Sequence, residues 1–309
     1  MPDQGRKSSA APSLSNQPNS ACLPQTACLA QAIEKLKSLH YGDQGLLETV
    51  THGWRAVPPL RALLYKREPS GIFQPRCRVV QALVILKAYD VLAEFLATPR
   101  EAADPVERIG DEVVINRAAR ALGGLHELHA FELLMWLAET NPLPGVMAAL
   151  GGSGRVEAIP YLVAALAEDE SRLAAETSLR NFGLLAHQAL AVAACRSSDE
   201  APESESRLRQ RRSALGLLSE TGVRPELWPV LRKLMQDRDT KISVLACKIC
   251  LKSASEPERR GSVLRLRSLL RAADFLLKEE IESCLAIHFG RSAEQLERER
   301  AAKTALFGM

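Results

Sequence analysis

The stretch Ala158-Ile159-Pro160-Tyr161-Leu162 predicts the start of a helix. Proline is tolerated in a first helical turn because its missing N–H would have no partner there. The same pattern, an apolar residue, a proline and then a leucine two positions on, occurs at Val57-Pro58-Pro59-Leu60 and Trp228-Pro229-Val230-Leu231. Pro58 and Pro160 lie 102 positions apart, three steps of 34, and Pro160 and Pro229 lie 69 apart, two steps of 34.5. A helix start that recurs at multiples of one period indicates an array of helical repeats.

Between these positions the chain alternates between two amphipathic helices. We call the first helix of each pair A and the second B. Apolar residues at helical spacing, broken by glycine, proline and polar runs, predict an all-α superhelix of about six to eight antiparallel A–B pairs. Asp111 is the predicted N-cap of the third A helix, after a loop at Thr98–Gly110. No segment has the alternation typical of a strand, so no sheet is predicted. The predicted pairs are 43–52 with 54–67, 74–89 with 91–97, 111–122 with 128–139, 142–150 with 156–168, 171–182 with 184–195, 207–218 with 228–235, and 240–253 with 259–273, and helices at 275–289 and 292–306 close the chain.

Composition divides the chain into a tail and one repeat domain. Residues 1–20 are rich in Ser, Pro, Gln and Asn and predict a disordered tail, whereas residues 21–309 carry the helical pattern, with an acidic, serine-rich loop at 197–206. No run of 18 apolar residues indicates a membrane span, and the N-terminus has no apolar secretory segment. The seven cysteines are odd in number and irregularly spaced. We therefore expect a cytoplasmic protein with reduced thiols.

Three A helices share an Ala-Leu-Gly pattern, at residues 121–123, 149–151 and 214–216. Gly123, Gly151 and Gly216 are expected to let A and B helices approach closely. Together with the apolar-Pro-x-Leu patterns, these residues resemble the HEAT-repeat superfamily, and in particular its short bacterial, phycobilisome-lyase-like repeats, over roughly residues 43–275. Leu179 is followed by arginine and the helix at 247–251 lacks the glycine, so some repeats depart from the pattern. The resemblance implies a right-handed superhelix with B helices lining its concave side.

Few residues are arranged for chemistry. Cys247-Lys248-Ile249-Cys250 is a CxxC inside a helix without a second ligand pair at usable spacing, so buried core cysteines are expected rather than a zinc or redox site. His126-Glu127-Leu128-His129 provides a single His-Glu pair, too few ligands for the two-iron sites of some HEAT-like hydroxylases. No nucleophile motif, P-loop or dinucleotide-binding glycine pattern is present. We therefore expect no enzyme activity, no catalytic or metal-binding residues and no cofactor.

The C-terminal third is basic: residues 205–309 hold 21 Lys and Arg against 14 Asp and Glu. Members of the family mostly bind other proteins, and a few act on tetrapyrrole-bearing proteins or nucleic acid. We therefore predict a scaffold that binds another protein on its concave face, through an acidic part of that partner. We expect neither nucleic acid nor a membrane as its partner. Two alternatives stay open: a lyase-like or chaperone role on a tetrapyrrole-bearing protein, and nucleic-acid binding through the basic third. The predicted contacts are a basic strip on neighbouring B helices and an apolar anchor if it is exposed: Arg232, Lys233, Arg267, Arg271 and Trp228.

Overall fold

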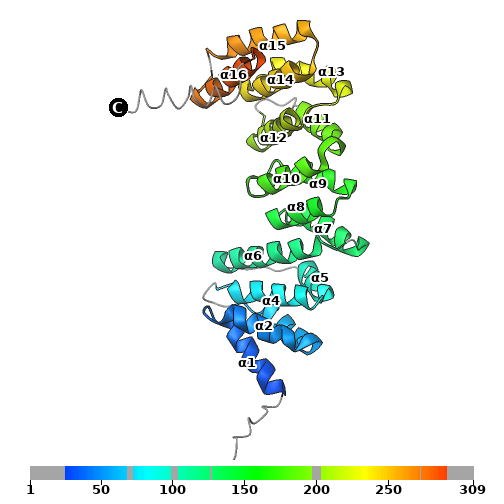
Figure 1. Cartoon of the computed structure of the whole chain (residues 1–309), viewed down its shortest axis with the longest axis vertical. Coiled ribbons are helices and arrows are strands. Elements are labelled where there is room, and N and C mark those ends of the chain that lie inside the picture. The colour runs from blue at the N-terminus through cyan, green and yellow to red at the C-terminus, as the bar shows by residue number, and fades with distance from the viewer. Residues whose placement is uncertain are drawn as a thin grey trace, which may run out of the picture.

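Helices make up the whole of the regular structure that the computed structural model describes, which covers residues 25–67, 72–98, 104–125, 127–196, 203–271 and 273–290. These residues form α-helices and short 3-10 turns without any strand, so the predicted all-α solenoid is confirmed. Figure 1 shows one column in which the A helices stack on one side and the B helices on the other. The A helices are α2 (Gly42–Thr51), α4 (Gln74–Ile85), α6 (Pro105–Leu122), α8 (Pro144–Gly152), α10 (Asp169–Phe182), α12 (Glu205–Thr221) and α14 (Thr240–Ser253).

The B helices follow their A partners and are mostly shorter. Three of them begin at the proline pattern: α3, α9 and α13 each carry proline in the first turn, and each follows a 3-10 turn, at Gly53–Ala56, Val156–Ala158 and Pro225–Leu227. The repeating proline pattern therefore marks the start of the second helix in its pair, as predicted. The B helices are α3 (Val57–Tyr65), α5 (Tyr89–Ala97), α7 (Leu128–Thr140), α9 (Ile159–Ala165), α11 (His187–Cys195), α13 (Trp228–Leu231), which η5 (Arg232–Gln236) continues, and α15 (Glu256–Leu269). Helix α1 (Gln25–Lys37) precedes the pairs and α16 (Phe275–His288) follows them.

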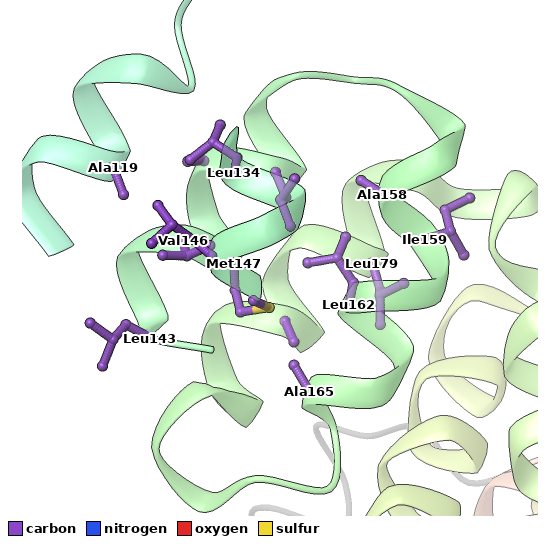
Figure 2. Close-up of a cluster of buried hydrophobic side chains, with 14 of the residues drawn as sticks. Ala119, Leu134, Leu143, Val146, Met147, Ala158, Ile159, Leu162, Ala165 and Leu179 are labelled. Carbon is purple, nitrogen blue, oxygen red and sulfur yellow. The ribbon is translucent and has the colours of Figure 1, made fainter. Parts of the chain in front are cut away.

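One apolar core runs along the column between the A and B layers. Buried side chains from α1 to α14 form a single contiguous cluster, and a second cluster joins α14 to α15 and α16. Figure 2 shows the middle of the first cluster, where Met147 of α8, Leu162 of α9 and Leu179 of α10 lie between their helices. All three are at most 1% exposed. Each pair thus buries its apolar stripe against its neighbours rather than in a core of its own.

Glycines set the spacing within the A layer, and this corrects the prediction that they bring A against B. A Cβ at Gly123 would lie 2.6 Å from the Cα of Ala149 on the next A helix. At Gly151 it would lie 2.1 Å from the Oγ of Ser178, again on the next A helix. Gly216 differs, because a Cβ there would meet no heavy atom within 4 Å. Two of the three glycines therefore permit close A–A contact, and the third faces open space.

The A layer is the more closely packed of the two layers. Successive A helices contact one another more extensively than successive B helices do, except α10 and α12, whose contact is no larger than that of several B pairs. The resemblance implied B helices on the concave side, and that stays a prediction. The close A–A approach that Gly123 and Gly151 allow accounts for the packing of α6, α8 and α10.

The third A helix begins earlier than predicted. Asp104, not Asp111, is its N-cap: the Asp104 carboxylate accepts a hydrogen bond from the Val106 N–H at 2.8 Å, and Pro105 occupies the first helical position. Asp111 lies inside the helix and is buried, where its carboxylate accepts hydrogen bonds from Arg76 at 2.5 Å and from Arg67 at 2.6 Å. Its burial raises its pKa, but the two guanidinium groups outweigh this and hold the pKa below its ordinary value. The helix therefore contains a buried ionised carboxylate where a cap was expected.

Several sequence predictions lie outside the described residues. These are the tail at 1–20, the helix at 292–306, His126 and most of the acidic loop, residues 197–202.

Candidate functional site

The predicted basic strip lies on the B side of the last two pairs. Arg232 and Lys233 are exposed on η5, and Arg267 and Arg271 are exposed on or just after α15. The guanidinium of Arg267 lies over the ring of Phe289 at the end of α16, with 6.0 Å to the ring centroid. The structure therefore presents these four cations to solvent on neighbouring helices, and their part in binding stays a prediction.

Trp228 does not fit the role of surface anchor. It is 6% exposed, and its indole N–H donates to Glu258 Oε1 at 3.0 Å. Hydrogen bonds from Ser255 and Trp228, with the charge of Arg232, hold the pKa of Glu258 below its ordinary value. The first turn of α13 packs toward α15, so the indole is part of the packing between repeats. Trp54 and Trp136, by contrast, are exposed on η1 and α7.

The CxxC motif lies in the core of the stack. Cys247 and Cys250 are fully buried in α14, and burial raises the pKa of the Cys247 thiol to about 12. A thiol of this kind is protonated at neutral pH and unreactive. Within the described ranges, no group of three or more His, Cys, Asp and Glu side chains is placed to hold a metal ion. The six cysteines in the described part of the chain are free.

Six arginines of the basic C-terminal third are engaged by acidic side chains or backbone carbonyls of the same chain. Arg211 is 2% exposed and donates to the Ala194 carbonyl at 2.9 Å, to Glu203 at 2.7 Å and to Asp237. Arg265 donates to the Met235 carbonyl at 3.0 Å. Ion pairs or carbonyl hydrogen bonds occupy further arginines in the same way. These are Arg209, Arg212, Arg259 and Arg260. These guanidinium groups therefore already have acceptors within the chain, which leaves fewer donors for a polyanion.

A hollow of about 300 Å³ opens on the A-helix side near the C-terminal end of the column, and we call it the A-face hollow. Helices α10, α12 and α14 contribute most of its lining, and α16 contributes Glu280. Leu217 and Leu245 give it an apolar floor, because both are buried among the helices. Between them Gly216 leaves space that a side chain would otherwise fill. The lining residues are Arg172, Glu176, Arg180, Arg212, Ser213, Gly216, Leu217, Ser219, Glu220, Lys241, Leu245, Lys248 and Glu280.

Ion pairs set the register of the three A helices around the A-face hollow. Arg180 Nε donates to Glu220 Oε2 at 2.7 Å, which joins α10 to α12. Arg212 donates to Asp239 at 2.6 Å, which joins α12 to the start of α14. Residues four apart lie on one face of a helix, so the lining falls into three rows that cross the helices. The first row is Arg172, Arg212 and Lys241, the middle row Glu176, Gly216 and Leu245, and the third row Arg180, Glu220 and Lys248.

Basic and acidic side chains both line the rim of the A-face hollow. The hydrogen bond from Glu220 raises the pKa of Arg180, and that from Asp239 raises the pKa of Arg212. Burial raises the pKa of Asp239, but Arg212 and the Ile242 N–H outweigh it and keep the pKa below its ordinary value. Glu280 pairs with Lys241 and lies 3.7 Å from Lys248. A ligand here would meet ionised groups of both signs around an apolar floor.

Arg172 and Lys248 are the two rim cations whose nearest carboxylate in the described residues lies beyond hydrogen-bond distance. The terminal nitrogen of Arg172 lies 3.6 Å from Glu176 Oε1, which is too long for a hydrogen bond. Its Nε is buried and has no hydrogen-bond partner in the described part of the chain. Buried polar groups are almost always hydrogen-bonded, so an unpartnered guanidinium N–H requires an explanation. Sequence reasoning missed this site, although arginine, glutamate and arginine at 172, 176 and 180 form a visible stripe on one helix face.

No helix among those described is both long and apolar enough to cross a membrane.

Comparison with known proteins gives little beyond the fold. No protein-family model matches the chain, and no curated protein matches it. Among solved structures, the chain is similar to the complex of CpcE and CpcF of phycocyanin lyase from Nostoc sp. PCC7120, at 22% identity over 84% of this chain and 100% of that chain. The TM-score is 0.36, so the two chains superpose loosely and no residue of one is assigned from the other.

Proposed function

We propose that the protein is a non-catalytic, cytoplasmic protein-binding scaffold whose partner docks on the A-helix side, over the A-face hollow. The observation that carries this proposal is the opening at Gly216, where the otherwise close A layer leaves about 300 Å³ among charged side chains. A solenoid offers an extended surface rather than an enclosed pocket. Charged rims steer a partner and fix its orientation more than they add affinity.

The proposal includes the absence of catalysis. In the described residues the A-face hollow has no cysteine or histidine in its lining, and its carboxylates are paired with cations. General acid–base chemistry most often uses a histidine, or a carboxylate whose pKa is raised toward the working pH, and pairing with a cation opposes such a rise. Binding is therefore the function that this set of residues supports best.

A pull-down from the native host tests the docking surface. Gly216→Trp would fill the A-face hollow, and Gly261→Trp is its matched control, because Gly261 on α15 also has no neighbouring heavy atom within 4 Å of a built Cβ. We expect the partner to be lost with Gly216→Trp and kept with Gly261→Trp, with both variants as helical as the wild type. Retention of the same partners by both variants would refute docking at the A-face hollow.

The basic strip on the B side is the competing surface for the same function. A variant with Arg232, Lys233, Arg267 and Arg271 changed to glutamate belongs in the same pull-down. Loss of the partner from this variant alone would move the docking surface to the B helices. Exposed ion pairs contribute only about 0.2–1 kcal/mol each, so four together would be needed for a clear effect.

A lyase-like or chaperone role on a tetrapyrrole-bearing protein is the second candidate. It is favoured by the Ala-Leu-Gly and apolar-Pro-x-Leu patterns, which resemble the phycobilisome-lyase-like repeats. Titration with biliverdin, a linear tetrapyrrole, separates the two candidates by its visible absorption. A saturable spectral shift that Gly216→Trp removes would favour the second candidate, and an unchanged spectrum would favour the scaffold.

A further inference from the structure

We propose that the A-face hollow is a socket for the carboxylate of an acidic side chain on the partner, seated over Gly216 and bound by Arg172, Arg212 and Lys241. This inference rests on the proposed docking at the A-face hollow and names the chemistry that the hollow recognises.

Space for the side chain comes from Gly216. The hollow of about 300 Å³ is roughly ten times the share of liquid volume that one water takes, about 30 Å³. Leu217 and Leu245 lie beneath it and suit the methylene part of a glutamate, whereas the charged rim suits its carboxylate. An entirely apolar insert would instead leave the surrounding ionised groups without solvent.

Charge places the carboxylate at the first row. The first row consists of cations alone, and the acidic residues that contact them, Glu176, Asp239 and Glu280, lie outside the row. In the third row Glu220 is itself a member and pairs with Arg180. Five of the charged lining residues are cationic and three are anionic. Within this row Asp239 pairs with Arg212 and Glu280 with Lys241, whereas Arg172 lies 3.6 Å from Glu176 without a hydrogen bond to it. Arg172 is therefore the least neutralised cation of the first row.

Arg172 provides the specific contact. Guanidinium groups bind carboxylates through paired N–H donors, with shorter and stronger hydrogen bonds than neutral groups make. The Nε of Arg172 has no acceptor in the described part of the chain, and Glu176 is beyond hydrogen-bond distance. The Arg172 side chain is 42% exposed, so a partner carboxylate can reach the outer part of its guanidinium and give it an acceptor at hydrogen-bond distance.

Fluorescence anisotropy with fluorescein-labelled hexaglutamate tests the socket in the full-length protein. We expect saturable binding by the wild type, at least tenfold weaker binding by Arg172→Gln and none by Gly216→Leu. The controls are Arg260→Gln, whose arginine also pairs with a glutamate four residues away but is exposed on α15, and Gly261→Leu. Both controls should bind within twofold of the wild type. Absence of binding by the wild type, or equal loss in the controls, would overturn the inference.

A labelled hexapeptide of phosphoserine distinguishes carboxylate from phosphate. Binding tenfold tighter than that of hexaglutamate, and dependent on Arg172, would make phosphate the ligand and overturn the carboxylate assignment. The hexaglutamate assay and the pull-down test the socket and the docking proposal separately. A host partner that depends on Gly216 while hexaglutamate fails to bind would leave the scaffold standing and remove the socket. Arg172-dependent hexaglutamate binding with an indifferent pull-down would keep the socket and remove the docking proposal.

Discussion

The Ala-Leu-Gly pattern occurs both in the middle of the column and near its C-terminal end, but its glycine has a different packing environment in the two regions. At α6, α8 and α10 the glycines bring each A helix against the backbone or Ser178 side chain of the next, so the layer is closed. At α10, α12 and α14 the glycine of the same pattern, Gly216, meets nothing within 4 Å, and charged side chains surround the opening. A repeat pattern therefore predicts that a helix belongs to the stack, whereas the distance to the neighbouring helix decides what its glycine does.

The largest expected effect concerns the buried ion pairs of Arg211, near the C-terminal region of α10, α12 and α14, which we call the open end. Arg211→Met should lower the free energy of unfolding by about 3–5 kcal/mol, because removing one partner leaves the carboxylates of Asp237 and Glu203 partly buried without their cation. Arg212→Met, at a pair whose arginine is 37% exposed, should cost about 1 kcal/mol or less. Urea unfolding followed by circular dichroism measures both. Equal losses would show that the buried network does not hold the open end.

The second prediction tests the close packing of α6, α8 and α10, which we call the closed region. Gly123→Ala should destabilise the fold by about 1–3 kcal/mol, because its Cβ would lie 2.6 Å from the Cα of Ala149 and one helix must move. Thermal unfolding is a suitable measurement. A variant as stable as the wild type would mean that the A layer is not closed there.

A smaller, pH-dependent effect belongs to the open end. His187 is 1% exposed beside Thr221 of α12, and burial, with the charge of Arg224, lowers its pKa below the ordinary value near 6.5. The unfolded chain then binds the proton more readily, so the stability from neutral His187 is complete above pH 6.5 and is lost as the pH falls below it. His187→Gln should flatten the stability profile between pH 7 and 5. An unchanged slope would contradict this assignment.

The smallest effect has the opposite sign. Gly216→Ala should stabilise the protein by about 0.5–1 kcal/mol, because alanine favours helix and its Cβ has room at this position. The same change thus destabilises at Gly123 and stabilises at Gly216. Two variants destabilised alike would erase the contrast between the two regions.

Local signals in the sequence predicted the helices well. The helix at Thr240–Ser253 has the predicted bounds, and Pro58, Pro160 and Pro229 mark B-helix starts. The cap at Asp104 was missed because Asp111 and Glu112 resemble the beginning of a helix equally well, and only tertiary contacts show that Asp111 is buried against Arg76.

The candidate site was not predictable in the same way. The A-face hollow depends on how far α10, α12 and α14 lie from one another, which no single helix encodes. The pair Arg180–Glu220 spans 40 positions, whereas Gly123 meets Ala149 across only 26. The 40 positions between Arg180 and Glu220 include the acidic, serine-rich insertion at 197–206. The arginines were visible in the sequence, but their partners, and therefore which of them remained available, were not.

The arginines that reach across repeats have a mechanical consequence. Arg76 on α4 donates to the Leu64 carbonyl at the end of α3, Arg211 on α12 to the Ala194 carbonyl at the end of α11, and Arg265 on α15 to the Met235 carbonyl of η5. Each guanidinium is rooted in one repeat and tied to the backbone of the one before it. In a linear array, stability is divided between the units and the joints between them. Hydrogen bonds of this kind strengthen the interfaces between repeats. Under tension several repeats should therefore unfold together, rather than one helix pair at a time.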